Sequence, residues 1–261
     1  MKQSQFYYLL RRGLFSAGSA IIKNGLVMFN KFTTAGLNFP VQGSAAFNGT
    51  SDYIEVNPAP VGSESALTIS CWVNTTNTST RGLISKGTGG VSDFILFGNL
   101  SPYKVGIFLQ TTTANSGNVY STTTLNDGKW HLITASWDGS NVRLYVDGSL
   151  EGSSAVTGTL NNSESNMYIG AYSDNDNYLN GNLANVAIWN RALTSDEINS
   201  VMWKPYQALS ATESNGLQAW YSLDDITSPA ASLANMEQLA TDKDATIENA
   251  NAITSAINKL S

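Results

Sequence analysis

The chain has 261 residues, only 13% of which are charged, and a formal net charge of −6 at pH 7. This length suits one large domain with flanking segments better than two equal domains, and the net acidity argues against nucleic-acid binding by that domain, since such binding needs a basic surface. The single cysteine excludes an intramolecular disulfide bond.

The first 40 residues are predicted to form a docking arm. Residues 1–51 carry five basic side chains and no acidic one, a formal +5, whereas the rest of the chain sums to −11. Basic and aromatic side chains mixed in this way favour contact with an acidic or apolar protein partner. The residues that we expect to make this contact are Phe6, Tyr7, Tyr8, Arg11 and Arg12.

Two alternatives to a docking arm are open: a secretory or membrane-associated segment, and an irregular cap on the main domain. A secretory signal places its basic residues before an uninterrupted apolar run, but here the aromatic run precedes Arg11 and Arg12. The ten residues from Gly13 to Ile22 are too few to cross a bilayer. We therefore expect no transmembrane segment in the arm.

Short alternating segments separated by turn residues follow the arm. They run from Ala45 to Val56, from Ala66 to Val73 and from Leu83 to Gly87. Alternation with a period of two, between turns rich in Gly, Ser, Thr and Asn, is typical of an antiparallel β-sandwich. Cys71 falls on the apolar face of the second segment, so we expect a buried small side chain rather than a reactive thiol.

A β-hairpin is the clearest local prediction. Residues 130–137 alternate, a turn-rich loop follows, and Val142 to Val146 resume the alternation. Asp-Gly pairs at 127–128 and 147–148 mark turns at both ends of this segment.

The hairpin sequence, DGKWHLITASWDG followed by LYVDG, resembles the laminin-G-like family of jelly rolls, which is also called concanavalin A-like or pentraxin-like. Further blocks that resemble this family are AAFNGTSDYIEV, ALTISCWV, LISKG and YIGAYSDNDNYLNGNLANVAIWNRALTSDEI. They occur in the family's order over about residues 41–203. The resemblance therefore implies an all-β jelly-roll sandwich over 41–203. It implies little about function, because this fold hosts lectins, adhesion modules, hydrolases and structural domains.

A polar loop at residues 173–177 is the candidate binding site. Relatives of this fold hold Ca²⁺ through Asp and Asn loops at the rim of the sandwich, so the resemblance implies a calcium site with Asp174, Asp176 and Asp52 as ligands. Asx-rich loops are also ordinary turns, and this alternative stays open. Tyrosine rings beside amide groups suit a sugar. The candidate glycan-binding residues are Tyr172, Asn175, Asn177 and Tyr178.

A short helix and a C-terminal extension follow the sandwich. Thr194 and Glu197 have the spacing of a capping box, which predicts a helix of two turns that runs to about Met202. In the extension, residues 204–261, the alternating segment 217–225 resembles a strand that usually opens this kind of domain. It is a permuted or exchanged strand, a truncated second unit or a separate subdomain, and we favour the first. Residues 247–260 have the spacing of a short helix.

Catalytic chemistry is not expected. His131 is the sole histidine and lies in the middle of a predicted strand, where a structural role is usual. Without a second histidine and without an activated Ser or Cys partner, we expect no nucleophilic triad. Retaining glycoside hydrolysis needs two carboxyl groups about 5–5.5 Å apart, and the Glu-x-Asp-x-x-Glu strand pattern of laminarinase-type relatives is absent.

The sequence thus predicts a non-enzymatic structural or recognition protein. We expect a surface-exposed subunit of a larger particle, such as a phage or viral virion, whose arm docks on the particle and whose sandwich serves adhesion or glycan binding, with homo-oligomers as one arrangement. The alternative is a secreted or cell-surface calcium-dependent lectin-like module, and a glycan hydrolase is a remote third.

Overall fold

The structure is a computed structural model. It describes residues 21–23, 26–28, 43–88, 91–98, 104–113, 118–163, 165–172 and 177–223. Residues 1–42 and 43–261 form two units. In the first unit, β1 (Ile21–Lys23) pairs with β2 (Leu26–Met28) in an antiparallel ribbon. Within the described ranges, no helix is long and apolar enough to span a membrane.

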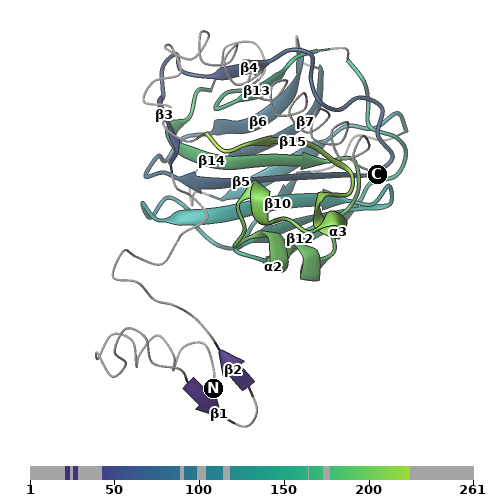
Figure 1. Ribbon diagram of the computed structural model, residues 1–261. Coiled ribbons are helices and arrows are strands. Elements are labelled where there is room, and N and C mark those ends of the chain that lie inside the picture. The colour runs from purple at the N-terminus through teal and green to yellow at the C-terminus, as the bar shows by residue number, and fades with distance from the viewer. Residues whose placement is uncertain are drawn as a thin grey trace, which may run out of the picture. The chain divides into compact units, whose positions relative to one another are not determined.

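The second unit is a sandwich of two antiparallel sheets (Figure 1). The first, which we call the helix-side sheet, has the order β12 (Ser149–Ala155), β11 (Asn141–Val146), β10 (Trp130–Trp137), β5 (Leu67–Asn74), β14 (Asn180–Trp189) and β15 (Leu217–Tyr221), and β3 (Ala45–Asn48) also pairs with β14. The second, the open sheet, has the order β4 (Ile54–Val56), β13 (Met167–Ile169), β6 (Arg81–Thr88), β7 (Val91–Gly98), β8 (Val105–Leu109) and β9 (Val119–Tyr120). The all-β sandwich expected from the alternating segments is confirmed.

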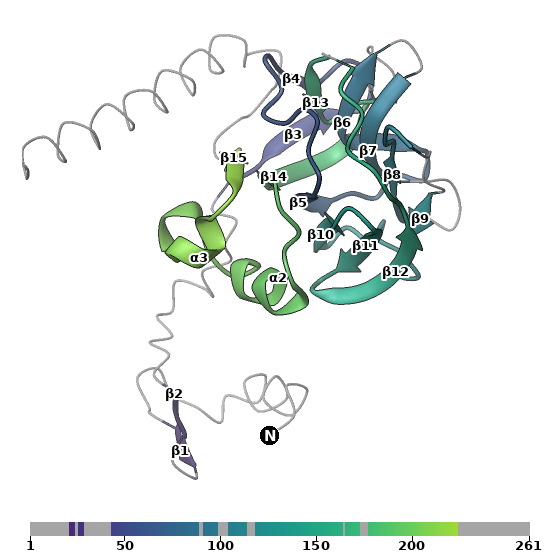
Figure 2. The same cartoon turned by 90° about the vertical axis from the view of Figure 1, so that its right-hand side faces the viewer.

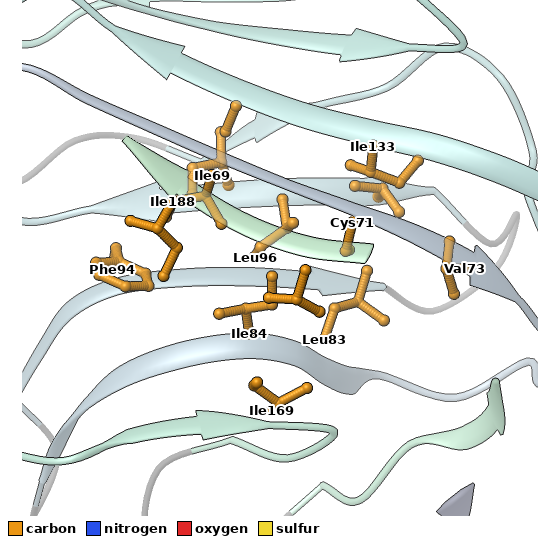
Figure 3. Close-up of a cluster of buried hydrophobic side chains, with 14 of the residues drawn as sticks. Ile69, Cys71, Val73, Leu83, Ile84, Phe94, Leu96, Ile133, Ile169 and Ile188 are labelled. Carbon is orange, nitrogen blue, oxygen red and sulfur yellow. The ribbon is translucent and has the colours of Figure 1, made fainter. Parts of the chain in front are cut away.

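Apolar side chains from both sheets meet between them (Figure 3). Cys71 is fully buried there with Ile69 from the same strand, and Leu83 and Phe94 from the open sheet lie in the same cluster. Burial raises the pKa of the Cys71 thiol to about 12. The predicted burial of Cys71 is confirmed. Burial disfavours the reactive thiolate, because its charge would lie in an apolar environment.

The predicted hairpin is confirmed. Strands β10 and β11 pair with Ile133 opposite Val146 and Trp137 opposite Val142. Because side chains alternate along a strand, Ile133 and Trp137 enter the core, while Thr134 turns to the outer face of the helix-side sheet.

The outer face of the helix-side sheet is covered by short helices, α2 (Ser195–Val201), η1 (Tyr206–Ala208) and α3 (Ala211–Ser214). The capping box predicted for α2 is confirmed: the Thr194 hydroxyl accepts from the Glu197 N–H, and the Glu197 carboxylate accepts from the Thr194 N–H. Ile198 and Val201 pack in a second, smaller cluster that includes Trp189 of β14. The helix therefore uses one apolar face to close the outside of this sheet.

The alternating segment after the helices forms β15, which pairs with β14 of its own chain, with Ala219 opposite Ile188. Leu223, just beyond β15, is buried in the main core. Strand β3 pairs with β14 only from Asn180 to Leu183, and β15 pairs with it from Val186 to Trp189. The pairing with β15 therefore removes an exposed edge. The helix expected over 247–260 lies outside the described residues.

Candidate functional site

The outer face of the open sheet carries no covering helix among the described elements, and it includes half-buried aromatic side chains such as Tyr168 and Phe108. One row of directly opposed residues crosses five strands: Glu55, Tyr168, Ser85, Ile95 and Phe108. Their neighbours along each strand, such as Ile54 and Leu96, belong to the core. The alternation therefore directs this row away from the core.

A short segment, residues 170–172, lies over strand β6 on this face, and we call it the strap. The Ser85 hydroxyl donates to the Ala171 carbonyl at 3.0 Å, and the Gly82 N–H donates to the Asn177 carbonyl at 3.0 Å. A Cβ atom on Gly82 would lie 2.2 Å from the Ala171 carbonyl carbon. Only glycine at position 82 allows the strap to lie this close to the sheet.

The strap brings Tyr172 to Phe97 and Tyr120, and we call these three residues the aromatic trio. The Phe97 ring centroid lies 5.9 Å from that of Tyr120, nearly perpendicular at 89°, and 6.2 Å from that of Tyr172. A Cβ atom on Gly106 would lie 2.8 Å from the Phe97 ring. Glycine there provides the space in which the rings pack. Tyr120 is 37% exposed, whereas Phe97 is 4% exposed, so the tyrosines form the surface and the phenylalanine its base.

The trio also offers hydrogen-bonding groups. The Asn118 side-chain amide donates to the Tyr120 hydroxyl at 2.7 Å, which leaves the Tyr120 proton available to an external acceptor. Partial burial raises the pKa of Tyr172, and the neighbouring Tyr120 phenol raises it further. The Tyr172 phenol therefore stays protonated at neutral pH and can donate a hydrogen bond.

A second ring cluster lies at the β4–β13 end of the same sheet. Tyr53 packs 5.9 Å from Tyr168 and 6.1 Å from Tyr178 between ring centroids. Beside it, the Asn166 amide donates to the Glu55 carboxylate. The structure thus places two tyrosines predicted from the loop, Tyr172 and Tyr178, with different ring partners.

The remaining predicted ligand-binding residues have mixed placements. Asn177 contributes its backbone carbonyl to Gly82, and Asn175 lies outside the described residues. Sequence reasoning missed Phe97, Tyr53 and Tyr168. The sequence did hold a signal for Phe97. Side chains alternate along a strand, so Phe97 of β7 lies on the face opposite Phe94 and Leu96, which are core residues.

The predicted metal ligands are only partly described. Asp174 and Asp176 lie outside the described residues, as do the arm residues Phe6, Tyr7, Tyr8, Arg11 and Arg12. Asp52 is 8% exposed, and one of its carboxylate oxygens accepts from the Asn48 N–H at 3.1 Å. The described part of the chain contains no group of three or more His, Cys, Asp or Glu side chains suited to a metal ion.

His131 is held between two carboxylates. Its Nδ1 lies 2.8 Å from Asp147 Oδ2 and its Nε2 lies 3.2 Å from Asp127 Oδ1. The hydrogen bond to Asp147 is the main cause that raises the pKa of His131. This contact ties together the two Asp-Gly turns that flank the hairpin, which is a structural role.

A jelly-roll β-sandwich with an aromatic outer face is the class of protein that the fold and this site define. Residues 48–199 match the model of a laminin-G family that is described as the concanavalin A-like lectin/glucanases superfamily. The chain belongs to this superfamily, and the resemblance of the hairpin and its companion blocks is confirmed.

Solved structures show the same fold at low sequence identity. A heptameric SAP-like pentraxin from Limulus polyphemus is 15% identical with a TM-score of 0.53, covering 70% of this chain and 95% of that one. A "putative carbohydrate binding protein" from Bacteroides ovatus is 19% identical with a TM-score of 0.53, covering 70% of this chain and 51% of that one. No curated protein matches the chain.

Proposed function

We propose that this chain is a non-enzymatic recognition protein that binds glycans on the outer face of the open sheet. The aromatic trio is the observation that carries this proposal. Its rings offer an apolar surface to the C–H face of a pyranose, and the phenols of Tyr120 and Tyr172 offer hydrogen bonds to sugar hydroxyls. The name of the Bacteroides ovatus protein, which shares the fold, points to the same ligand class.

Binding rather than hydrolysis is favoured by the state of the nearby carboxylates. The Glu55 carboxylate accepts from Asn166. Asp93 of β7 is 0% exposed and forms an ion pair with Lys86, so a sugar on the surface has no contact with it. Glycoside hydrolysis needs a pair of free carboxyl groups across the scissile bond. Glu55 and Asp93 do not form such a pair.

The test is calorimetric titration of the purified chain with cellotetraose, laminaritetraose, xylotetraose and maltotetraose. We expect binding of at least one, weakened about tenfold or more by Tyr120→Ala and by Tyr172→Ala, since a central aromatic contact is worth at least about 1–2 kcal/mol. Leu150→Ala is the matched control, because Leu150 is an exposed apolar residue on β12. Unchanged binding in both tyrosine variants contradicts the proposal.

Calcium belongs to the same proposal. We propose that Asp174 and Asp176 bind Ca²⁺ at the loop that follows the strap, since carboxylate oxygens are the ligands that Ca²⁺ prefers. Calcium titration of chelator-treated protein should show saturable binding that Asp174→Asn together with Asp176→Asn removes. Equal calcium binding by that double variant contradicts this assignment.

We further propose a setting outside the cell or on a particle, with the arm as the docking element. The acid-free sequence of residues 1–51 supports the arm, and a virion surface is the setting that we favour over a secreted lectin. Deleting residues 1–36 should abolish incorporation into the particle while glycan binding by the sandwich persists. Normal incorporation of the truncated chain contradicts the docking role and favours the secreted or cell-surface lectin.

A further inference from the structure

Two aromatic side chains on the helix side of the sandwich are left half in solvent. Trp203, just after α2, is 55% exposed, and Tyr206, at the start of η1, is 50% exposed. The other large hydrophobic side chains exposed in the described part of the chain are Tyr120, in the trio, and Leu150. A tryptophan is usually well buried, so its exposure at this position points to a function.

The two rings flank a hollow between the helices and the helix-side sheet. The hollow is small, with room for about one water molecule, and its lining includes Ser70, Trp72, Lys204 and Trp220. Trp203 leans on Trp72 with 6.0 Å between ring centroids, and Tyr206 leans on Trp220 with 6.2 Å. Each exposed ring is therefore backed by an indole that lines the hollow.

The segment that carries these rings is held in place by a polar network. Lys204 Nζ lies 2.5 Å from Glu213 Oε1 and 3.1 Å from Ser200 Oγ. Glu213 also accepts from the Ser210 N–H at 2.8 Å as part of the capping box of α3. The Lys204 hydrogen bond is the main cause that lowers the pKa of Glu213 to about 2. Rings fixed before binding lose little conformational entropy when a ligand stacks on them.

We propose that Trp203 and Tyr206 form a second saccharide-binding site, on the side of the sandwich away from the aromatic trio. Figure 2 shows α2 and α3 on the left of the molecule and β7 to β9 of the open sheet on the right. The ligand class is the one given in the proposed function, but the site shares no residue with the trio. Sugar rings stack on Trp203 and Tyr206. Lys204, which lies between these two residues in the sequence, donates to sugar hydroxyl groups.

A saccharide fits this surface better than a protein partner does. Protein-binding patches are contiguous apolar areas of several hundred Å². Here Lys204 and Pro205 separate the two rings in the sequence, and the exposed residues nearby in the chain include polar ones, namely Asn199, Ser200, Gln207 and Thr212. Isolated rings among hydroxyl and amide groups match the alternating apolar and polar surfaces of a sugar.

Tryptophan fluorescence isolates the second site, because the trio contains no tryptophan. The full chain carrying Tyr120→Ala and Tyr172→Ala is titrated with cellotetraose, laminaritetraose, xylotetraose and maltotetraose. We expect at least one of these probes to shift the emission of that variant to shorter wavelength, as the half-exposed Trp203 ring loses water. Adding Trp203→Ala should remove the shift and weaken calorimetric binding about tenfold or more, and Tyr206→Ala should weaken it without removing the shift.

Leu150→Ala in the same background is the control and should leave both signals unchanged. Absence of binding by the Tyr120→Ala, Tyr172→Ala variant, when the unmodified chain binds, overturns the second site and leaves the trio proposal intact. Binding that survives Trp203→Ala unchanged also overturns it. Sedimentation of the unmodified chain as a dimer that Trp203→Ala converts to a monomer overturns it in favour of a contact between two copies.

Discussion

The ion pair between Lys86 and Asp93 gives the sharpest test of how the sandwich is stabilised. The two side chains are 1% and 0% exposed. Lys86 Nζ also donates to Asn162 Oδ1 at 3.2 Å, and the Asp93 carboxylate accepts from the Ser163 N–H at 3.2 Å and from its hydroxyl at 3.1 Å. The pair thus joins the β6–β7 hairpin to the loop at residues 161–163.

Removing one partner of this pair leaves the other charge buried without a counter-charge, which costs about 3–5 kcal/mol. We therefore expect Lys86→Met to lower the free energy of unfolding by that amount, and Asp93→Leu to do the same. For a domain of this size the melting temperature should fall by about 6–20 °C. The double variant should lose much less than the sum of the two, because it buries no unpaired charge.

Urea unfolding followed by circular dichroism measures these differences. Lys129→Met is the matched control: Lys129 pairs with Asp127 at 2.6 Å, but its side chain is 76% exposed, and exposed pairs contribute about 0–1 kcal/mol. A loss below about 1 kcal/mol for Lys86→Met, or single losses that simply add in the double variant, would refute the assignment of a buried, coupled pair.

Three further predictions follow from local contacts. Cys71, whose pKa burial raises to about 12, should resist a thiol reagent at pH 8 in the native protein and react on unfolding; rapid native labelling contradicts its burial. Gly106→Ala should weaken tetrasaccharide binding, because its Cβ would lie 2.8 Å from a ring of the trio, whereas Gly62→Ala, with its nearest contact at 3.6 Å, should not. His131 has a folded pKa raised chiefly by Asp147, so its stabilising contribution is complete below its ordinary pKa of about 6.5 and is lost as pH rises through the raised value; urea unfolding across this range should show that loss in the native chain and not in His131→Gln.

Local pattern predicted several elements without knowledge of the fold. The alternation from Trp130 to Val146 predicted the hairpin, and the spacing of Thr194 and Glu197 predicted the start of α2. These elements depend on residues within a few positions of one another, so short-range periodicity and capping chemistry contain enough information. The family resemblance extended the prediction to the whole sandwich, because the blocks lie in the family's order.

The ring clusters were decided by the tertiary structure. Phe97, Tyr120 and Tyr172 are far apart in sequence and meet only through the register of β6 to β9 and the strap. Gly82 and Gly106 act through close approach of distant chain segments, which no local pattern reports. Likewise the alternation of residues 217–225 predicted a strand, but the pairing of β15 with β14 depends on which edge the folded sheet leaves open. The sequence by itself determined which faces are apolar. Only the folded chain determined which of those faces meet, because strand pairing and register are contacts between residues distant in sequence.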